Sequence, residues 1–166
     1  LIIFGNLPYN ISSQILINFI NYSCSKFSYK KLVLMFQKEV ADRILAEDNS
    51  KNYGRLSIFS SWKLNIKKIM DISPSSFFPK PKVMSSLLIF EPKINYIKFK
   101  NSKNLEHITN VFFNQRRKMI KKPLNILFKN SQKVIDYLNL DTNLRPQNLK
   151  KDTFYKICLI YEKLIN

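Results

Sequence analysis

The fold is decided by the opening stretch Leu1-Ile2-Ile3-Phe4-Gly5-Asn6-Leu7-Pro8-Tyr9. Its first four residues are apolar, with isoleucines in the middle, and such a run is typical of a buried parallel strand. Gly5 is expected to let the chain turn sharply at the end of this strand. Because ligands in open α/β sheets bind just past the carboxyl ends of the strands, residues 6–9 stand where a binding site is expected.

The side chains of residues 6–9 suit a ligand with an exocyclic amine. The Asn6 oxygen and a backbone carbonyl beside the rigid Pro8 can both accept hydrogen bonds from one amino group. Tyr9 offers a flat face on which a base can stack. The same tetrapeptide is also typical of a plain turn that ends a strand, since Asn and Pro are common turn formers. These four residues alone leave both interpretations open.

The composition indicates a folded protein that binds a polyanion. The chain has 166 residues, of which 45% are hydrophobic and 13% aromatic, so it can build a core and is not disordered. Its 28 Lys and Arg residues against 11 Asp and Glu give a net charge of +17. Such an excess favours nucleic acid or an acidic membrane surface as partner, although an AT-rich genome would also enrich lysine.

Several classes of protein are excluded by what the sequence lacks. Two distant cysteines, Cys24 and Cys158, argue against a disulfide framework and indicate a reducing cytoplasm. The single histidine, His107, leaves little scope for zinc, and no apolar run approaches the length of a membrane span. The chain starts inside an expected strand and has only two glycines, without a Gly-rich nucleotide-binding turn. We therefore expect the later portion of a longer protein.

The hydrophobic pattern predicts an α/β part followed by a helical part. Strands are expected at 1–4, 31–36, 65–72 and 85–90, the last two pairing antiparallel, with helices after Ser12 or Ser13, at 37–46 and within 53–62. Beyond about residue 98 apolar residues recur at helical spacing, and Pro123 is expected to break a helix near Lys122 or to open a new one. The predicted domains are residues 1–97, the distal part of an α/β sheet, and residues 98–166, a small helical domain.

Two further segments carry candidate binding residues. The prolines of residues 73–83 stiffen a loop that can hold Phe77 against a flipped base opposite Tyr9. Alternatively this loop is a connector whose Phe packs into the core. The second segment is basic, and on one continuous helix its residues would form a face suited to RNA phosphates or an ordinary solvated surface. Its candidate residues are Arg116, Arg117, Lys118, Lys121 and Lys122.

Five motifs in one order resemble those of the ribosomal RNA adenine dimethyltransferases, which are related to the erythromycin-resistance methylases. They are Asn6-Leu7-Pro8-Tyr9-Asn10-Ile11-Ser12, Phe36-Gln37-Lys38-Glu39-Val40-Ala41-Asp42-Arg43, Tyr53-Gly54-Arg55-Leu56-Ser57, Phe77-Phe78-Pro79-Lys80-Pro81-Lys82-Val83 and Phe113-Asn114-Gln115-Arg116-Arg117-Lys118. The resemblance extends from Leu1 to near Phe154. It implies a Rossmann-like sheet whose Gly-rich turn and acidic ribose-binding residue would precede Leu1.

The resemblance also implies a chemistry. S-adenosylmethionine would donate a methyl group directly to adenines of small-subunit ribosomal RNA in a precursor 30S particle, without a metal or a covalent enzyme intermediate. Asn6 and the Leu7 carbonyl would accept hydrogen bonds from the adenine amine, with Pro8 beside them, and Tyr9 and Phe77 would stack on the base. Asn6 is the one residue here expected at the cofactor. We expect a cytoplasmic monomer without a membrane partner, inactive without the preceding segment.

Two other interpretations remain open. A non-catalytic RNA-binding factor of ribosome assembly could have lost the cofactor half. An adenine methylase of DNA shares the Asn-x-Pro-Tyr pattern, but the Phe77 loop and the helical tail argue against it.

Overall fold

Contacts divide the chain into two compact units. The computed structural model describes residues 1–22 and 29–164. The first unit is Leu1–Leu45 with Ser60–Tyr96, and the second is Ala46–Phe59 with Ile97–Asn166. The division therefore falls within helix α3 (Arg55–Lys63) as well as near residue 97. The domain boundary that we place at residue 97 from the sequence stays a prediction.

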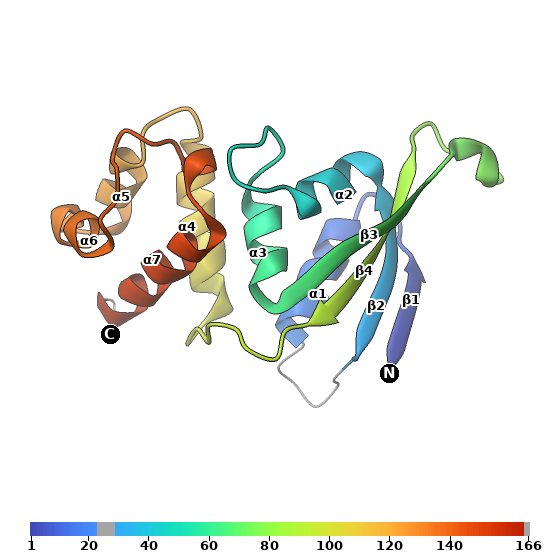
Figure 1. The fold of residues 1–166 in the computed structure, drawn as a ribbon, viewed down its shortest axis with the longest axis horizontal. Coiled ribbons are helices and arrows are strands. Elements are labelled where there is room, and N and C mark those ends of the chain that lie inside the picture. The colour runs from blue at the N-terminus through green and yellow to red at the C-terminus, as the bar shows by residue number, and fades with distance from the viewer. Residues whose placement is uncertain (23–28, 165–166) are drawn as a thin grey trace. The chain divides into compact units, whose positions relative to one another are not determined.

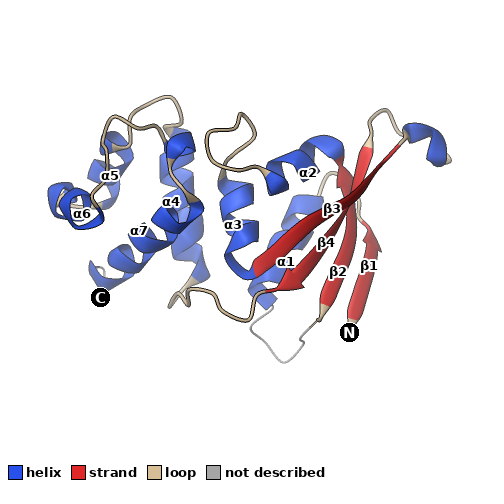
Figure 2. Cartoon of the chain, viewed as in Figure 1, coloured by secondary structure: helices blue, strands red, loops and turns tan. Residues whose placement is uncertain are grey.

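The first unit is built on a mixed four-stranded sheet, drawn in red in Figure 2. Its strands are β1 (Ile2–Asn6), β2 (Lys31–Gln37), β3 (Leu64–Ile72) and β4 (Ser85–Pro92), in the spatial order β1-β2-β4-β3. β1 pairs parallel with β2, whereas β4 pairs antiparallel with both β2 and β3. The predicted strands, and the antiparallel pairing of the last two, are confirmed.

Two helices cover one face of this sheet (Figure 1). They are α1 (Ser12–Tyr22), which buries Leu16 and Ile20 completely, and α2 (Lys38–Leu45), which buries Ala41 and Ile44. The apolar residues of β2 and β4 that are fully buried recur at every second position, as the pleat of a strand requires. They are Leu32, Leu34 and Phe36 on β2, and Leu88 and Phe90 on β4.

The other face of the sheet is less covered, so the prediction that residues 1–4 form a buried strand is partly wrong. β1 forms and pairs parallel as predicted, but it is the edge strand of the sheet. Ile2 exposes 52% and Phe4 75% of its surface. An apolar run indicates a strand, but it does not say which faces its neighbours cover.

Gly5 lies inside β1 and has no positive φ, so the predicted turn at this residue is wrong. A Cβ built at Gly5 would lie 2.9 Å from Cδ2 of Leu34 and 3.2 Å from Cδ2 of Leu7. A larger residue at this position would force these leucine side chains to shift, and the chain turns only after Asn6.

The second unit is mostly helical, as the sequence predicts (Figure 2). After α3 it contains α4 (Ser102–Asn114), α5 (Lys121–Leu127), α6 (Ser131–Leu138) and α7 (Lys151–Leu164). Phe112 on α4 packs edge-on against Phe154 on α7, with 5.2 Å between ring centroids. The Tyr155 hydroxyl donates to the Ile58 carbonyl at 2.7 Å, which fastens α7 to the first half of α3.

A buried carboxylate joins α7 to the start of α4. Glu162 accepts hydrogen bonds from the backbone amides of Lys100 and Asn101, at 2.9 and 3.1 Å, and from the Asn104 side chain at 2.8 Å. Burial alone would raise the pKa of this carboxyl, but the three donors hold it below its ordinary value. These bonds satisfy amides ahead of the helix that would otherwise be left without partners.

Candidate functional site

The loop after β1 is a tight turn that presents Asn6. The Ile11 amide donates to the Pro8 carbonyl at 3.2 Å, and the Ser12 hydroxyl donates to the Tyr9 carbonyl at 3.1 Å as α1 begins. Asn6 is the last residue of β1 and is exposed. Within the part of the chain that the structure describes, no side-chain hydrogen bond engages its amide. The turn interpretation and the ligand interpretation are therefore compatible, because the turn leaves the Asn6 oxygen available.

Tyr9 reaches across to the first residue of β4. Its hydroxyl lies 2.6 Å from Oγ of Ser85, which is completely buried. The ring itself is half-buried. A bond at the ring edge leaves the flat faces of the Tyr9 ring unoccupied by that contact.

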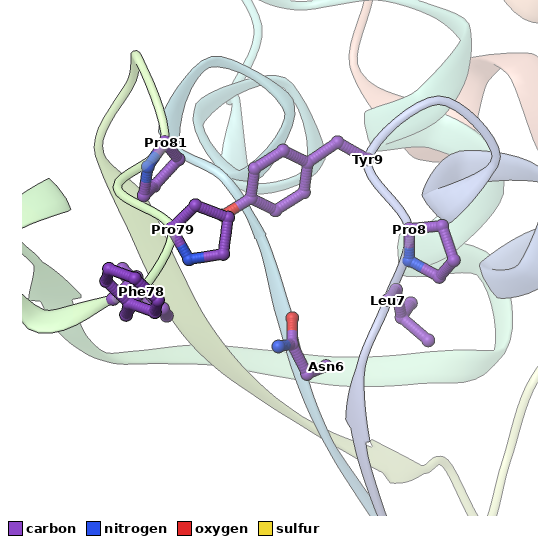
Figure 3. A pocket seen from close by; sticks show the side chains of 8 residues that line it. Asn6, Leu7, Pro8, Tyr9, Phe78, Pro79 and Pro81 are labelled. Carbon is purple, nitrogen blue, oxygen red and sulfur yellow. The ribbon is translucent and has the colours of Figure 1, made fainter.

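The β3–β4 loop forms the opposite wall of a pocket of about 300 Å³. This wall comes from a loop that begins with a short 3₁₀ helix (Pro74–Ser76), capped by the Ser73 hydroxyl at 3.3 Å from the Ser75 amide. In Figure 3 the Asn6 amide and the Tyr9 ring extend toward the side of Phe78 and Pro79. The pocket is lined by Asn6, Leu7, Pro8, Tyr9, Phe77, Phe78, Pro79 and Pro81.

The structure thus brings together all five residues predicted for the catalytic pocket: Asn6, Leu7, Pro8, Tyr9 and Phe77. Phe77 is half-buried, whereas Phe78 is fully exposed, with a relative exposure of 102%. The lining consists of aromatic rings, prolines, one leucine and one amide, with no charged side chain. Such a lining fits a flat, uncharged ring that carries a hydrogen-bond donor.

The start of β4 is fixed by a cluster around Asp71. The Ser86 hydroxyl donates to this carboxylate at 2.6 Å, and the ammonium groups of Lys68 and Lys38 donate at 3.2 and 3.3 Å. These donors, Ser86 foremost, lower the pKa of Asp71 to about 2. The Lys38 amide also donates to the Met84 carbonyl at 2.9 Å, which ties the end of the loop to the start of α2.

The prediction that the basic residues 116–122 form one helix face is wrong, because they do not lie on one helix. α4 ends at Asn114, residues 115–120 form an irregular loop that starts with a turn, and α5 begins at Lys121 with Pro123 as its third residue. The chain leaves the helix because Ile120 is drawn into the core and its amide donates to the Leu144 carbonyl at 2.9 Å. The candidate cations therefore lie along a loop and the first turn of the next helix.

Arg116 differs from the other candidates in this segment. Its Nε donates to the Gln147 side chain at 3.2 Å and its Nη2 to the Lys51 carbonyl at 2.5 Å. Four other candidate cations are exposed: Arg117, Lys118, Lys121 and Lys122. The guanidinium of Arg116 thus holds the loop in place, and the exposed four are the ones directed to solvent.

Other chemistry finds little support among the residues described. Burial of Cys158 away from water, and to a lesser extent the charge of Glu162, raise the pKa of its thiol to about 12. The thiol is therefore not a reactive thiolate. Cys24 lies outside the described residues. Within residues 1–22 and 29–164 no cluster of three or more His, Cys, Asp or Glu could hold a metal, and no helix is long and apolar enough to cross a bilayer.

Sequence reasoning missed Ser85, Phe78 and the Asp71 cluster. Nothing local distinguishes Ser85 from Ser86, and only the pleat of β4 decides which one faces Tyr9. Phe78 adjoins Phe77 in a proline-rich loop. The prolines indicate that an aromatic side chain is held in a fixed direction, but they do not indicate which of the two rings is exposed.

Comparison with known proteins gives a consistent family. A family described as "Ribosomal RNA adenine dimethylase" matches residues 1–163. The chain is 59% identical over 162 residues to ribosomal RNA small subunit methyltransferase A of Pelagibacter ubique (strain HTCC1062), covering 98% of this chain and 62% of that protein. The chain is 42% identical over 159 residues to ribosomal RNA small subunit methyltransferase A of Ehrlichia canis (strain Jake), covering 93% of this chain and 58% of that protein.

Solved structures show the same fold. A dimethyladenosine transferase from Plasmodium falciparum superposes with a TM-score of 0.83 at 27% identity, covering 98% of this chain and 66% of that one. The 23S rRNA methyltransferase ErmE superposes with a TM-score of 0.63 at 14% identity, covering 98% of this chain and 65% of that one, and shares the fold alone. The chain spans about three fifths of the length of the curated relatives named here.

Proposed function

The chain belongs to the ribosomal RNA adenine dimethylase family, and we propose that it supplies the base pocket and an RNA-binding segment of an enzyme that methylates adenine N6 in small-subunit ribosomal RNA. The observation that carries this proposal is the pocket at the end of β1, where Asn6, Tyr9 and Phe77 meet. The relatives' names supply the substrate class.

The pocket can hold an adenine and keep its amine nucleophilic. Oδ1 of Asn6 and the Leu7 carbonyl accept hydrogen bonds from the two N–H groups of the exocyclic amine, which orients the nitrogen lone pair. Tyr9 and Phe77 hold the two faces of the base after it has left its stack. None of these groups needs to be a strong base, because orientation and removal of water keep the lone pair available.

S-adenosylmethionine would supply the methyl group as an electrophile. Among the lining residues we expect only Asn6 to contact it, because the uncharged lining does not fit the carboxylate, ammonium and ribose of that molecule. The groups that bind most of the methyl donor are therefore expected in a segment before Leu1, as the longer relatives would allow.

RNA is expected to reach the second unit through phosphate contacts. The exposed residues Arg117, Lys118, Lys121 and Lys122, and the net charge of +17, suit a sequence-independent electrostatic attraction. A small-subunit precursor particle is the expected partner, bound by a cytoplasmic monomer.

Methyl transfer tests the proposal against a purely structural role in ribosome assembly. The N-terminal part of the Pelagibacter relative is joined before Leu1, and the chimera is incubated with unmethylated small-subunit particles and labelled S-adenosylmethionine. The proposal predicts label in N6-methylated adenosine of the RNA. A chimera that folds, binds the methyl donor and binds the particle, yet transfers nothing, would instead support the assembly factor.

A further inference from the structure

The hydroxyl group of Ser85, on β4, contacts the hydroxyl group of Tyr9 across the pocket region. Its Oγ lies 2.6 Å from the Tyr9 hydroxyl, although 76 residues separate the two in sequence. Ser85 is completely buried, and it pairs with Gln37 of β2 and with Ile72 of β3. It is thus held by strands on both sides and can move little.

The bond fixes the Tyr9 ring at its far end. At the near end, the Tyr9 carbonyl accepts from Ser12 in the turn before α1. A hydrogen bond at the hydroxyl fixes where the far end of the ring lies, and so restrains the first side-chain torsion, without covering the ring faces. Ser85 therefore fixes the position of the Tyr9 ring in the pocket wall.

The same residue also ends the loop that forms the opposite wall. Phe77, Phe78, Pro79 and Pro81 precede Ser85 by only a few residues, and the Lys38 amide fastens Met84, its immediate neighbour, at 2.9 Å. Ser85 thereby links the turn that carries Tyr9 to the loop that forms the opposite wall.

We propose that Ser85 is a positioning residue that holds the Tyr9 ring in place opposite the proline-rich wall, where an inserted base can stack on it. This inference rests on the proposed function, since it assigns a further residue to the same pocket. Ser85 touches neither the base nor the methyl donor and acts only through Tyr9.

Ser86 provides a matched control. It is equally buried, follows Ser85 on β4 and donates a hydrogen bond of the same length, 2.6 Å, but to Asp71. Successive side chains of a strand point to opposite faces, so Ser86→Ala does not touch Tyr9. It matches Ser85→Ala in position and burial but removes a stronger, charge-assisted bond from the same end of β4, which makes it the more demanding control.

The first test is kinetic and uses the active chimera. Ser85→Ala and Tyr9→Phe each remove one neutral hydrogen bond, which corresponds to about a three- to tenfold fall in kcat. KM and RNA affinity should stay within about twofold, the double variant should fall no further than either single one, and Ser85→Thr should restore the rate. A parental rate for Ser85→Ala, effects that multiply in the double variant, or an equal loss for Ser86→Ala would overturn the proposal.

The second test reads base stacking without methyl transfer. A single-stranded RNA with 2-aminopurine at the target position is bound to the 166-residue chain, and stacking on Tyr9 should quench its fluorescence. Ser85→Ala should recover a large part of the emission, and Ser86→Ala should not. Equal quenching by the parent and Ser85→Ala overturns the positioning role, whereas a Ser85-dependent signal in a chain whose chimera transfers no methyl group refutes only the enzymatic function.

Discussion

Gly5 shows how one missing side chain lets two strands pack closely. A methyl group at this position would meet Leu34 at 2.9 Å, and Leu34 is completely buried. Gly5→Ala should therefore lower the free energy of unfolding by about 1 kcal/mol, because overpacking displaces neighbours that have nowhere to go. Urea unfolding of the purified chain measures this.

Gly54→Ala is the matched control for that prediction. A Cβ at Gly54 meets nothing closer than the Phe113 ring at 3.8 Å, and its φ is not positive. Gly54 directly precedes α3, so this variant measures the loss of a glycine cap without overpacking, and its stability should fall by less than that of Gly5→Ala. Equal losses at both glycines would show that the close contact of Gly5 is not the cause.

Asp71 should make the stability of the chain depend on pH in acid. Hydrogen bonds from Ser86, Lys68 and Lys38 lower its folded-state pKa from 3.8 to about 2. A carboxylate with a depressed pKa stabilises the fold above its unfolded-state pKa, and this contribution is lost as the pH falls through the folded value. The stability difference between parent and Asp71→Asn should thus be constant above about pH 5 and shrink between pH 4 and 2. Urea midpoints across that range check it, and a difference that stays constant down to pH 2 would contradict it.

At the residue scale, the sequence reveals groups whose role is chemical and local. Asn6 and Tyr9 could be identified because the motif itself shows an amide and an aromatic ring beside a proline, and these groups suit a base with an exocyclic amine. Gly5 and Ser85 could not, because their roles depend on Leu34 and Tyr9, residues 29 and 76 positions away in the sequence.

The segment between α4 and α5 is where RNA affinity should depend most on salt. Each phosphate contact contributes about 0.7–0.9 to the slope of log affinity against log salt concentration. Replacing the exposed Arg117 and Lys121 by Gln should flatten that slope by about one to two units. Affinities for a small-subunit RNA fragment at several salt concentrations measure it.

Two comparisons sharpen the result. Lys103→Gln with Lys156→Gln removes the same charge from exposed positions on α4 and α7, and should change the slope less. Arg116→Gln should instead lower stability, because this side chain bonds to Gln147 and Lys51. If both double variants flatten the slope equally, the α4–α5 segment is ordinary charged surface.

At the element scale, periodic apolar residues predict the helices and strands well. They do not predict where each element ends or which of its faces is exposed. The basic residues were expected on one helix because their spacing permits it. Tertiary contacts decide otherwise, since Ile120 is buried and bonded to Leu144 while Arg116 is held by another loop. The position of β1 at the sheet edge likewise depends on its neighbours and not on its own apolar sequence.

As a whole, the 166-residue chain should bind RNA but not S-adenosylmethionine. Its two glycines do not form a Gly-rich turn whose amides could approach the donor, and the pocket lining is uncharged. Calorimetric titration of the chain with S-adenosylmethionine should show no stoichiometric heat, whereas the chimera should show binding. Tight one-to-one binding by the chain alone would mean that these 166 residues contain a complete cofactor site.

The order of five motifs, more than any single one, allowed the fold class and the pocket to be predicted from the sequence. The arrangement of the pocket walls could not be predicted. It depends on which side chains at the start of β4 point to each face of the sheet.

The central claim is that Asn6 orients the amine of an adenine, and single-turnover methyl transfer by the chimera tests it most directly when read beside an RNA-binding isotherm. Asn6→Ala removes one of two acceptors, which should cost about 2–4 kcal/mol in the transition state, or a thirty- to thousandfold loss of rate. RNA affinity should change little, because phosphate contacts dominate it, and Asn10→Ala, an exposed neighbour outside the pocket lining, should transfer normally. Transfer by Asn6→Ala at the parental rate, or a loss of RNA binding as large as the loss of transfer, would show that Asn6 is only the end of a strand.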